Sequence, residues 1–144
     1  MSAQPDLQEW MTRASRPVVA SPLVLVVEDD PAVREILRLR LELEGFKVLV
    51  AATGIEGLRC LDDSPDVAAV VCDISMPALD GPGLWEAVAR ENPQVAGRFV
   101  FVTGGAATPL QAQFLQDVSG LLPVLYKPAD LPMLGRTVRR TVDR

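Results

Sequence analysis

A short apolar run is followed by a stretch with the apolar spacing of an amphipathic helix five times along this chain. The runs lack polar alternation, which is typical of strands that are covered on both faces. The expected strands are Leu23 to Val27, Phe46 to Ala51, Val67 to Cys72, Arg98 to Thr103 and Leu121 to Tyr126. Crossovers of helical length require a parallel sheet with right-handed connections and helices on both faces. The sequence therefore predicts an α/β fold.

The helical stretches carry start and stop signals. Thr108 is expected to cap a helix that has Pro109 at its first position, and Pro31, which follows three acids, suits the first turn of another helix. Helices are expected over Ala32 to Glu44, Ile55 to Leu61 and Gly83 to Glu91, after Thr108-Pro109, and after Asp130. The inner stripes are expected to include Val33, Ile36, Leu37 and Leu41; Ile55, Leu58 and Leu61; Leu110, Phe114 and Val118; and Leu131, Leu134, Val138 and Val142.

Composition and charge indicate a cytoplasmic protein that binds neither nucleic acid nor membrane. Hydrophobic residues make up 49% of the chain and the net charge is −5, which argues against non-specific binding to nucleic acid. No apolar run approaches the ~18 residues of a membrane span. We divide the chain into an N-terminal arm, residues 1–21, and a domain over residues 22–144. The arm has no signal-peptide core, and Leu7, Trp10, Met11 and Ala14 give it helical spacing.

The chain contains no histidine and two cysteines. The absence of histidine excludes Ser–His and Cys–His nucleophile pairs and imidazole ligation of zinc. It also means that any phosphohistidine donor must lie outside these residues. Cys60 and Cys72 fall within apolar patterns and are expected to be small buried thiols.

Polar side chains follow four of the five predicted strands. Glu28 and Asp29 come after the first strand, Asp73 after the third, Thr103 ends the fourth and Lys127 follows the fifth. The carboxyl ends of parallel strands meet at one edge of a sheet, where ligands bind. Crowded carboxylates repel one another unless a cation joins them, and hard oxygen ligands suit magnesium.

The chemistry of this edge indicates phosphoryl acceptance. A carboxylate such as that of Asp73 can act as a nucleophile and form an acyl phosphate. The Lys127 ammonium can pair with that carboxylate or with a phosphate oxygen, and the Thr103 hydroxyl can donate to a phosphate oxygen. A metal and the lysine would neutralise charge on the transferred group.

Four segments together resemble the response-regulator receiver domain of two-component signalling. They are Val26-Val27-Glu28-Asp29-Asp30-Pro31, Asp73-Ile74-Ser75-Met76-Pro77-Ala78-Leu79-Asp80-Gly81, Phe101-Val102-Thr103-Gly104-Gly105 and Tyr126-Lys127-Pro128. Their order and intervals are similar to those of the family. The resemblance covers residues 22–144 and implies a flavodoxin-like, doubly wound (βα)5 fold with strand order 2-1-3-4-5.

The resemblance implies a role for each polar residue. Asp73 would be the phosphoacceptor, Thr103 the switch hydroxyl and Lys127 the partner of the phosphate or carboxylate. Magnesium, or manganese in its place, would be held by Asp29, Asp73, the Ser75 carbonyl and, through water, Glu28. Asp30 is expected to serve only as an acid at a helix N-terminus. Two positions depart from the family. Val124 stands where the family usually has its switch aromatic, with Tyr126 two residues further on. Gly105 stands two residues after Thr103, where many relatives carry a charged or bulky residue.

The resemblance also implies partners and an activity. The protein would be a phosphoacceptor in a phosphorelay, an enzyme only for its own phosphorylation and dephosphorylation. Its partners would be a histidine kinase or phosphotransfer protein and a downstream protein. A homodimer through the fourth helix, fifth strand and fifth helix is one option that no residue decides. No DNA-binding output domain is expected in this chain, which resembles single-domain regulators and receivers of hybrid histidine kinases.

Three other interpretations compete with this one. A pseudo-receiver would use the same fold as a binding module without phosphorylation. A haloacid-dehalogenase-like phosphatase would carry a second aspartate two residues after the first, where Ser75 stands. A flavin carrier of the same topology would need a hydroxyl- or glycine-rich loop after the first strand, where Glu28, Asp29 and Asp30 would repel phosphate.

Overall fold

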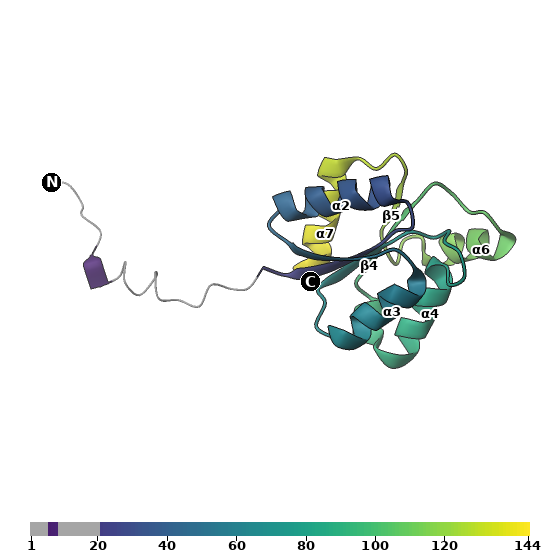
Figure 1. Ribbon diagram of the computed structural model, residues 1–144, viewed down its shortest axis with the longest axis horizontal. Helices are drawn as coiled ribbons and strands as arrows, with labels where there is room; N and C mark the ends of the chain where they lie inside the picture. Colours follow the sequence, from purple (N-terminus) through teal and green to yellow (C-terminus); the bar gives the residue numbers. More distant parts are fainter. Residues whose placement is uncertain (1–5, 9–20) are drawn as a thin grey trace.

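A five-stranded parallel sheet forms the middle layer of the computed structural model, with helices on both faces (Figure 1). The structure describes residues 6–8 and 21–144. The strands are β1 (Leu23–Val27), β2 (Lys47–Ala51), β3 (Ala69–Cys72), β4 (Phe99–Thr103) and β5 (Val124–Tyr126). They pair in the order β2-β1-β3-β4-β5, and every pair is parallel. The predicted fold class and strand order are therefore confirmed.

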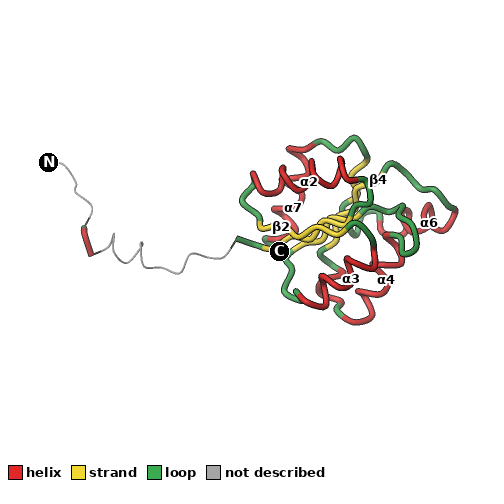
Figure 2. Tube along the Cα trace, in the orientation of Figure 1, coloured by secondary structure: helices red, strands yellow, loops and turns green. Residues whose placement is uncertain are grey.

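Two helical layers cover the sheet, as the red and yellow segments of Figure 2 show. Helices α2 (Pro31–Leu43) and α7 (Leu131–Val142) pack on one face. The other face carries α3 (Gly54–Asp63), α4 (Gly81–Glu91), the short α5 (Pro93–Ala96) and α6 (Pro109–Val118). No helix among the described residues has the length and apolar character that crossing a membrane would require.

Each central strand contributes to two hydrophobic cores. In β4, Phe99 and Phe101 pack under α4 and α6, whereas Val100 and Val102 pack under α2 and α7. Successive side chains of a strand point to opposite faces, so a strand covered on both faces is apolar throughout. This explains the continuous apolar runs of the sequence.

The predicted helix caps are present. The Thr108 hydroxyl accepts a hydrogen bond from the backbone N–H of Gln111, and the Asp130 carboxylate accepts one from the N–H of Met133. Asp30 caps α2 in the same way, through the N–H groups of Ala32 and Val33. These bonds satisfy donors that lack a partner inside the helix.

Several predicted details are wrong. Ile36, Ile55 and Leu110 were expected on inner faces but are exposed. Ile55 and Leu110 are each the second residue of a helix. In both helices the side chain of the third residue turns back and accepts a hydrogen bond from the backbone N–H of the residue before the cap. This geometry directs the second residue outward. Ile36 lies beside the stripe that faces the sheet, in which Leu37 and Leu41 are buried.

The fifth strand is shorter than predicted, and α5 was not expected at all. Leu121 and Leu122 donate their backbone N–H groups to the Val118 carbonyl, so this segment continues the end of α6 as a turn and cannot pair with β4. In the arm, Leu7 is helical and Asp6 accepts a hydrogen bond from the N–H of Gln8. The rest of the predicted arm stripe, Trp10, Met11 and Ala14, lies outside the described residues.

Candidate functional site

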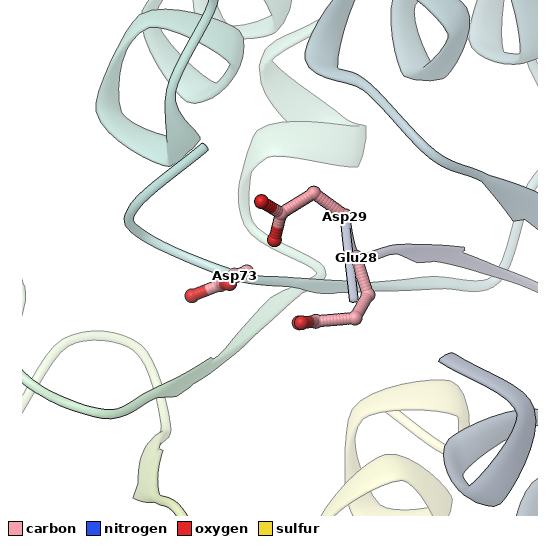
Figure 3. A group of neighbouring side chains, drawn as sticks. All are labelled: Glu28, Asp29 and Asp73. Atoms are coloured by element: carbon pink, nitrogen blue, oxygen red, sulfur yellow. The ribbon is translucent and has the colours of Figure 1, made fainter. Parts of the chain in front are cut away.

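Three carboxylates meet at the carboxyl edge of the sheet. Glu28 and Asp29 follow β1, and Asp73 follows the neighbouring β3, so their side chains turn toward one another (Figure 3). Each offers an oxygen, and these oxygens lie within 4.8 Å of one another. Glu28 and Asp73 are only 1% and 5% exposed, whereas Asp29 faces solvent. The structure therefore brings together the three acids that the sequence analysis singled out.

Lys127 enters the same cluster from the end of β5. Its ammonium donates to both carboxylate oxygens of Glu28, at 2.9 and 3.1 Å, and to Oδ2 of Asp73 at 3.2 Å. All three of its donors are thus directed to buried acids. Lys127 pairs with two of the three carboxylates, and the cluster of hard, anionic oxygens suits a divalent cation such as magnesium.

Burial shifts the protonation of this pair. It raises the pKa of the Glu28 carboxyl to about 7, although the hydrogen bonds from Lys127 act to lower it and the charge of Asp73 adds to the rise. Burial also acts to lower the pKa of Lys127, but its contacts with Glu28 and Asp73 outweigh that effect and the pKa is raised. The ammonium therefore remains charged at neutral pH.

The Thr103 hydroxyl is engaged with its own loop. The side chain is fully buried at the end of β4, where its oxygen accepts from the N–H of Gly105 at 3.0 Å and its hydroxyl donates to the Gly105 carbonyl at 3.1 Å. Turning this hydroxyl toward Asp73 would require both bonds to Gly105 to break. The site thus contains a polar group whose present partners lie in the adjacent loop.

The loop after Asp73 folds tightly against its own strand. Oδ1 of Asp73 accepts a hydrogen bond from the N–H of Ser75 at 3.3 Å. A Cβ on Gly81, the first residue of α4, would meet the carbonyl oxygen of Asp73, so only glycine fits there. Ala78 adopts a φ of 66°, in the left-handed region. This packing fixes the backbone that follows Asp73.

Some residues lie apart from the cluster or were missed. Asp30 lies at the N-terminus of α2, as predicted, and its side chain caps that helix. Tyr126 is exposed at the end of β5, paired in register with Thr103. Gln111 was not singled out, yet it is buried and bonds Asp80 in the loop after Asp73. The Thr-x-x-Gln pattern from Thr108 to Gln111 is the signal that could have found it, since it predicts a side chain that turns back over the helix start.

Comparison with known proteins gives a consistent picture. The family described as response regulator receiver domain matches residues 24–139. The chain is 34% identical over 126 residues to the sensor kinase CckA of Brucella abortus (strain 2308), covering 86% of this chain and 13% of that protein. It is 32% identical over 126 residues to the C4-dicarboxylate transport transcriptional regulatory protein DctD of Rhizobium meliloti (strain 1021), covering 87% of this chain and 26% of that one.

Solved structures agree. A response regulator receiver domain protein from Clostridium thermocellum superposes with a TM-score of 0.74 at 25% identity, covering 85% of this chain and 95% of that one. The chain spans about a quarter or less of the length of the two curated relatives named above, so the likeness concerns one domain of each. Since the family match extends over most of the sequence and the fold agrees, this chain belongs to the response regulator receiver domains of two-component signalling.

Proposed function

We propose that this domain accepts a phosphoryl group on Asp73 from a histidine outside the chain, in a reaction that depends on magnesium. The observation that carries the proposal is the buried Asp73 carboxylate, held by Lys127 beside two further acids. The 144 residues contain no histidine, so the donor histidine lies outside them, and a histidine kinase or phosphotransfer protein is the proposed donor. The cytoplasmic location expected from the sequence belongs to the same proposal.

Asp29 and Asp73 are the proposed direct ligands of magnesium, or of manganese in its place. The Ser75 carbonyl is a further ligand, and Glu28, whose oxygens are both bonded to Lys127, acts through water. When bound, the metal would neutralise charge on the acids and on the incoming phosphoryl group. The surplus of carboxylate charge at the edge of the sheet supports this assignment.

The proposed reaction uses one oxygen of Asp73 as the nucleophile. A bond forms between this oxygen and phosphorus, and the bond from phosphorus to the donor's imidazole nitrogen breaks. That nitrogen keeps the electron pair and takes up a proton. The Lys127 ammonium, 3.2 Å from Oδ2 of Asp73, is close enough to balance the charge of the phosphorylated side chain. The domain would catalyse only its own phosphorylation and dephosphorylation.

Phosphorylation would then change a surface. The new group offers strong hydrogen-bond acceptors, and Thr103 would leave Gly105 to reach them. That movement would shift the loop after β4 and, with it, the face made by α6, β5 and α7. This face would bind the downstream protein, and a homodimer through it is one form that the output could take. Tyr126, exposed on this face, would stand in for the aromatic that Val124 replaces.

Intact mass spectrometry tests the proposal. The protein is incubated with acetyl phosphate and magnesium, beside Asp73→Asn, Asp73→Ala and a sample in which EDTA removes the metal. We expect the parent to gain one phosphoryl group, and the two variants and the EDTA sample to gain none. A parent that gains nothing while magnesium binds would favour a pseudo-receiver, and phosphate stably bound to Asp73→Asn would refute the assignment of Asp73.

A further inference from the structure

A buried amide joins the two loops that carry the proposed chemistry. Gln111 lies in the first turn of α6 and is 5% exposed. Its Nε2 donates to Oδ2 of Asp80 at 3.1 Å, and its Oε1 accepts from the backbone N–H of Ala107 at 2.8 Å. Asp80 ends the loop after Asp73, and Ala107 belongs to the loop after Thr103. We refer to these two bonds as the Gln111 bridge.

Both ends of the bridge are anchored. The other oxygen of Asp80 accepts from the N–H of Gly83 at 2.9 Å and so caps α4. The backbone N–H of Gln111 is held by the hydroxyl of Thr108 at 3.1 Å. Because each partner is fixed at the start of a helix, the bridge sets the position of the first turn of α6 relative to α4.

The loop between Thr103 and α6 has little else to hold it. Its residues from Gly104 to Thr108 are exposed, except Gly105, which is partly buried and bonds the Thr103 hydroxyl. The loop is therefore fixed at one end by Thr103 and at the other by Gln111. Moving Thr103 toward Asp73 must displace Gly105, and the bridge opposes that displacement from the far end of the loop.

We propose that Gln111 is a positioning residue. The Gln111 bridge holds the loop after β4 in the arrangement in which Thr103 faces Gly105. The bridge opens when Thr103 turns toward Asp73. This inference rests on the proposed function. A contact made in only one of two arrangements favours that arrangement by its own free energy. Loss of the bridge therefore makes the turned arrangement more accessible and speeds phosphoryl uptake.

Paired substitutions break and rebuild the bridge. Gln111→Glu places a carboxylate against Asp80 but keeps an acceptor for Ala107. Asp80→Asn can keep the cap on Gly83 but presents an amide group to the amide of Gln111. The double variant exchanges donor and acceptor, so that an amide again faces a carboxylate. Gln113→Glu is the matched control, because the Gln113 amide makes the same kind of bond, to Asp117 at 2.8 Å, on the exposed side of α6.

Two measurements give the outcome. The time course of phosphoryl uptake from acetyl phosphate should be about three- to tenfold faster in each single variant, the effect expected from losing the net contribution of one typical hydrogen bond. It should be near the parental rate in the double variant and in Gln113→Glu. Amide hydrogen exchange of residues 104–108 in the unphosphorylated protein should quicken in both single variants and return toward the parental rate in the double variant.

Several results would overturn the proposal. Single variants that take up phosphate at the parental rate or more slowly would do so, as would a double variant that behaves like the singles. Thermal unfolding shows whether a single variant has a folding defect. In that case the double variant tests the proposal, because it restores the hydrogen bond without restoring the parental residues. If even the parent takes up no phosphate, the proposed function fails, and unchanged exchange of residues 104–108 in the single variants would separately refute the positioning role.

Discussion

Removing the charge of Asp29 tests two expected properties of the acidic cluster separately: repulsion among its carboxylates and stabilisation by magnesium. Asp29 is the exposed member, and its carboxylate lies within 4.8 Å of oxygens of Glu28 and Asp73. Asp29→Asn removes one negative charge and keeps the size of the side chain. We expect the metal-free protein to become more stable, because repulsion is relieved, and magnesium to stabilise the variant much less than the parent.

The magnitude follows from the separation of the charges. Two like charges about 5 Å apart repel by about 1 kcal/mol in water and by about 3.5 kcal/mol at an effective dielectric of about 20. Asp29 is exposed and Lys127 offsets part of the repulsion, so the lower value applies, and the free energy of unfolding should rise by about 1 kcal/mol. For a chain of this length that corresponds to roughly 3–5 °C in melting temperature.

The substitution should change the stabilisation by magnesium in the opposite direction, because the variant gains less from the metal than the parent does. A ligand that binds only the native state at ten times its Kd stabilises it by about 1.4 kcal/mol. The parent should gain about this much, and Asp29→Asn, which lacks a proposed direct ligand, should gain less than about 0.5 kcal/mol at the same magnesium concentration. Thermal unfolding followed by circular dichroism, in EDTA and across a magnesium series, measures both effects.

Asp30→Asn is the matched control. Asp30 is the next acid in the sequence, but its Oδ1 caps α2 through the N–H groups of Ala32 and Val33 at 2.9 and 3.2 Å. Asparagine caps helices about as well, so this variant should unfold near the parental temperature and keep the full gain from magnesium. The reasoning is refuted if Asp29→Asn is less stable than the parent in EDTA, or if both variants lose the same part of the magnesium gain.

Two further predictions concern the loop after Asp73 and the cysteines. Ala78 has a φ of 66°, so Ala78→Gly should raise the free energy of unfolding by up to about 1 kcal/mol. A Cβ at position 81 would meet the Asp73 carbonyl, so Gly81→Ala should lower the free energy of unfolding by more than about 2 kcal/mol. Urea unfolding measures both changes, and the reverse order of stability would contradict the packing described. Burial raises the pKa of both thiols, but Cys60 is partly exposed whereas Cys72 is fully buried. A thiol reagent should therefore modify Cys60 alone in the native protein and both cysteines after unfolding. Equal rates of modification of the two cysteines in the native protein would contradict this.

The convergence at the edge of the sheet could be predicted because it depends on little. Glu28, Asp73 and Lys127 each follow an apolar strand directly, and all strands run the same way, so their ends must meet. Neither helix rotation nor loop conformation enters that argument. The contacts themselves could not be predicted: nothing in the sequence indicates that Lys127 gives two of its hydrogen bonds to Glu28 and one to Asp73.

Helix faces were harder, because apolar spacing fixes the period of a helix better than its rotation. In α2 the exposed Ile36 and the buried Leu37 are neighbours, and either fits a stripe with Val33, three or four residues before them. The extent of β5 failed for a different reason. Leu121 and Leu122 are apolar enough for a strand, but their N–H groups are used to close the end of α6.

The errors in α3 and α6 have a common physical cause at the carboxyl edge of the sheet. In each helix the capping threonine is followed, three residues on, by a side chain that turns back: Glu56 to the N–H of Ala52, and Gln111 to that of Ala107. That geometry directs the apolar second residue outward, which leaves Leu110 84% exposed.

The two helices then differ in one respect. Glu56 is exposed, whereas Gln111 is buried against Asp80, in the loop that follows the proposed phosphoacceptor. An ordinary cap needs only the contact with the backbone N–H before the capping threonine. The contact with Asp80 places the polar side chain of Gln111 where the apolar pattern predicts Leu110. Conflicts of this kind between local pattern and structure are expected where function constrains the chain. The exception in the pattern of α6 is thus itself a reason to test Gln111 before the other residues of its loop.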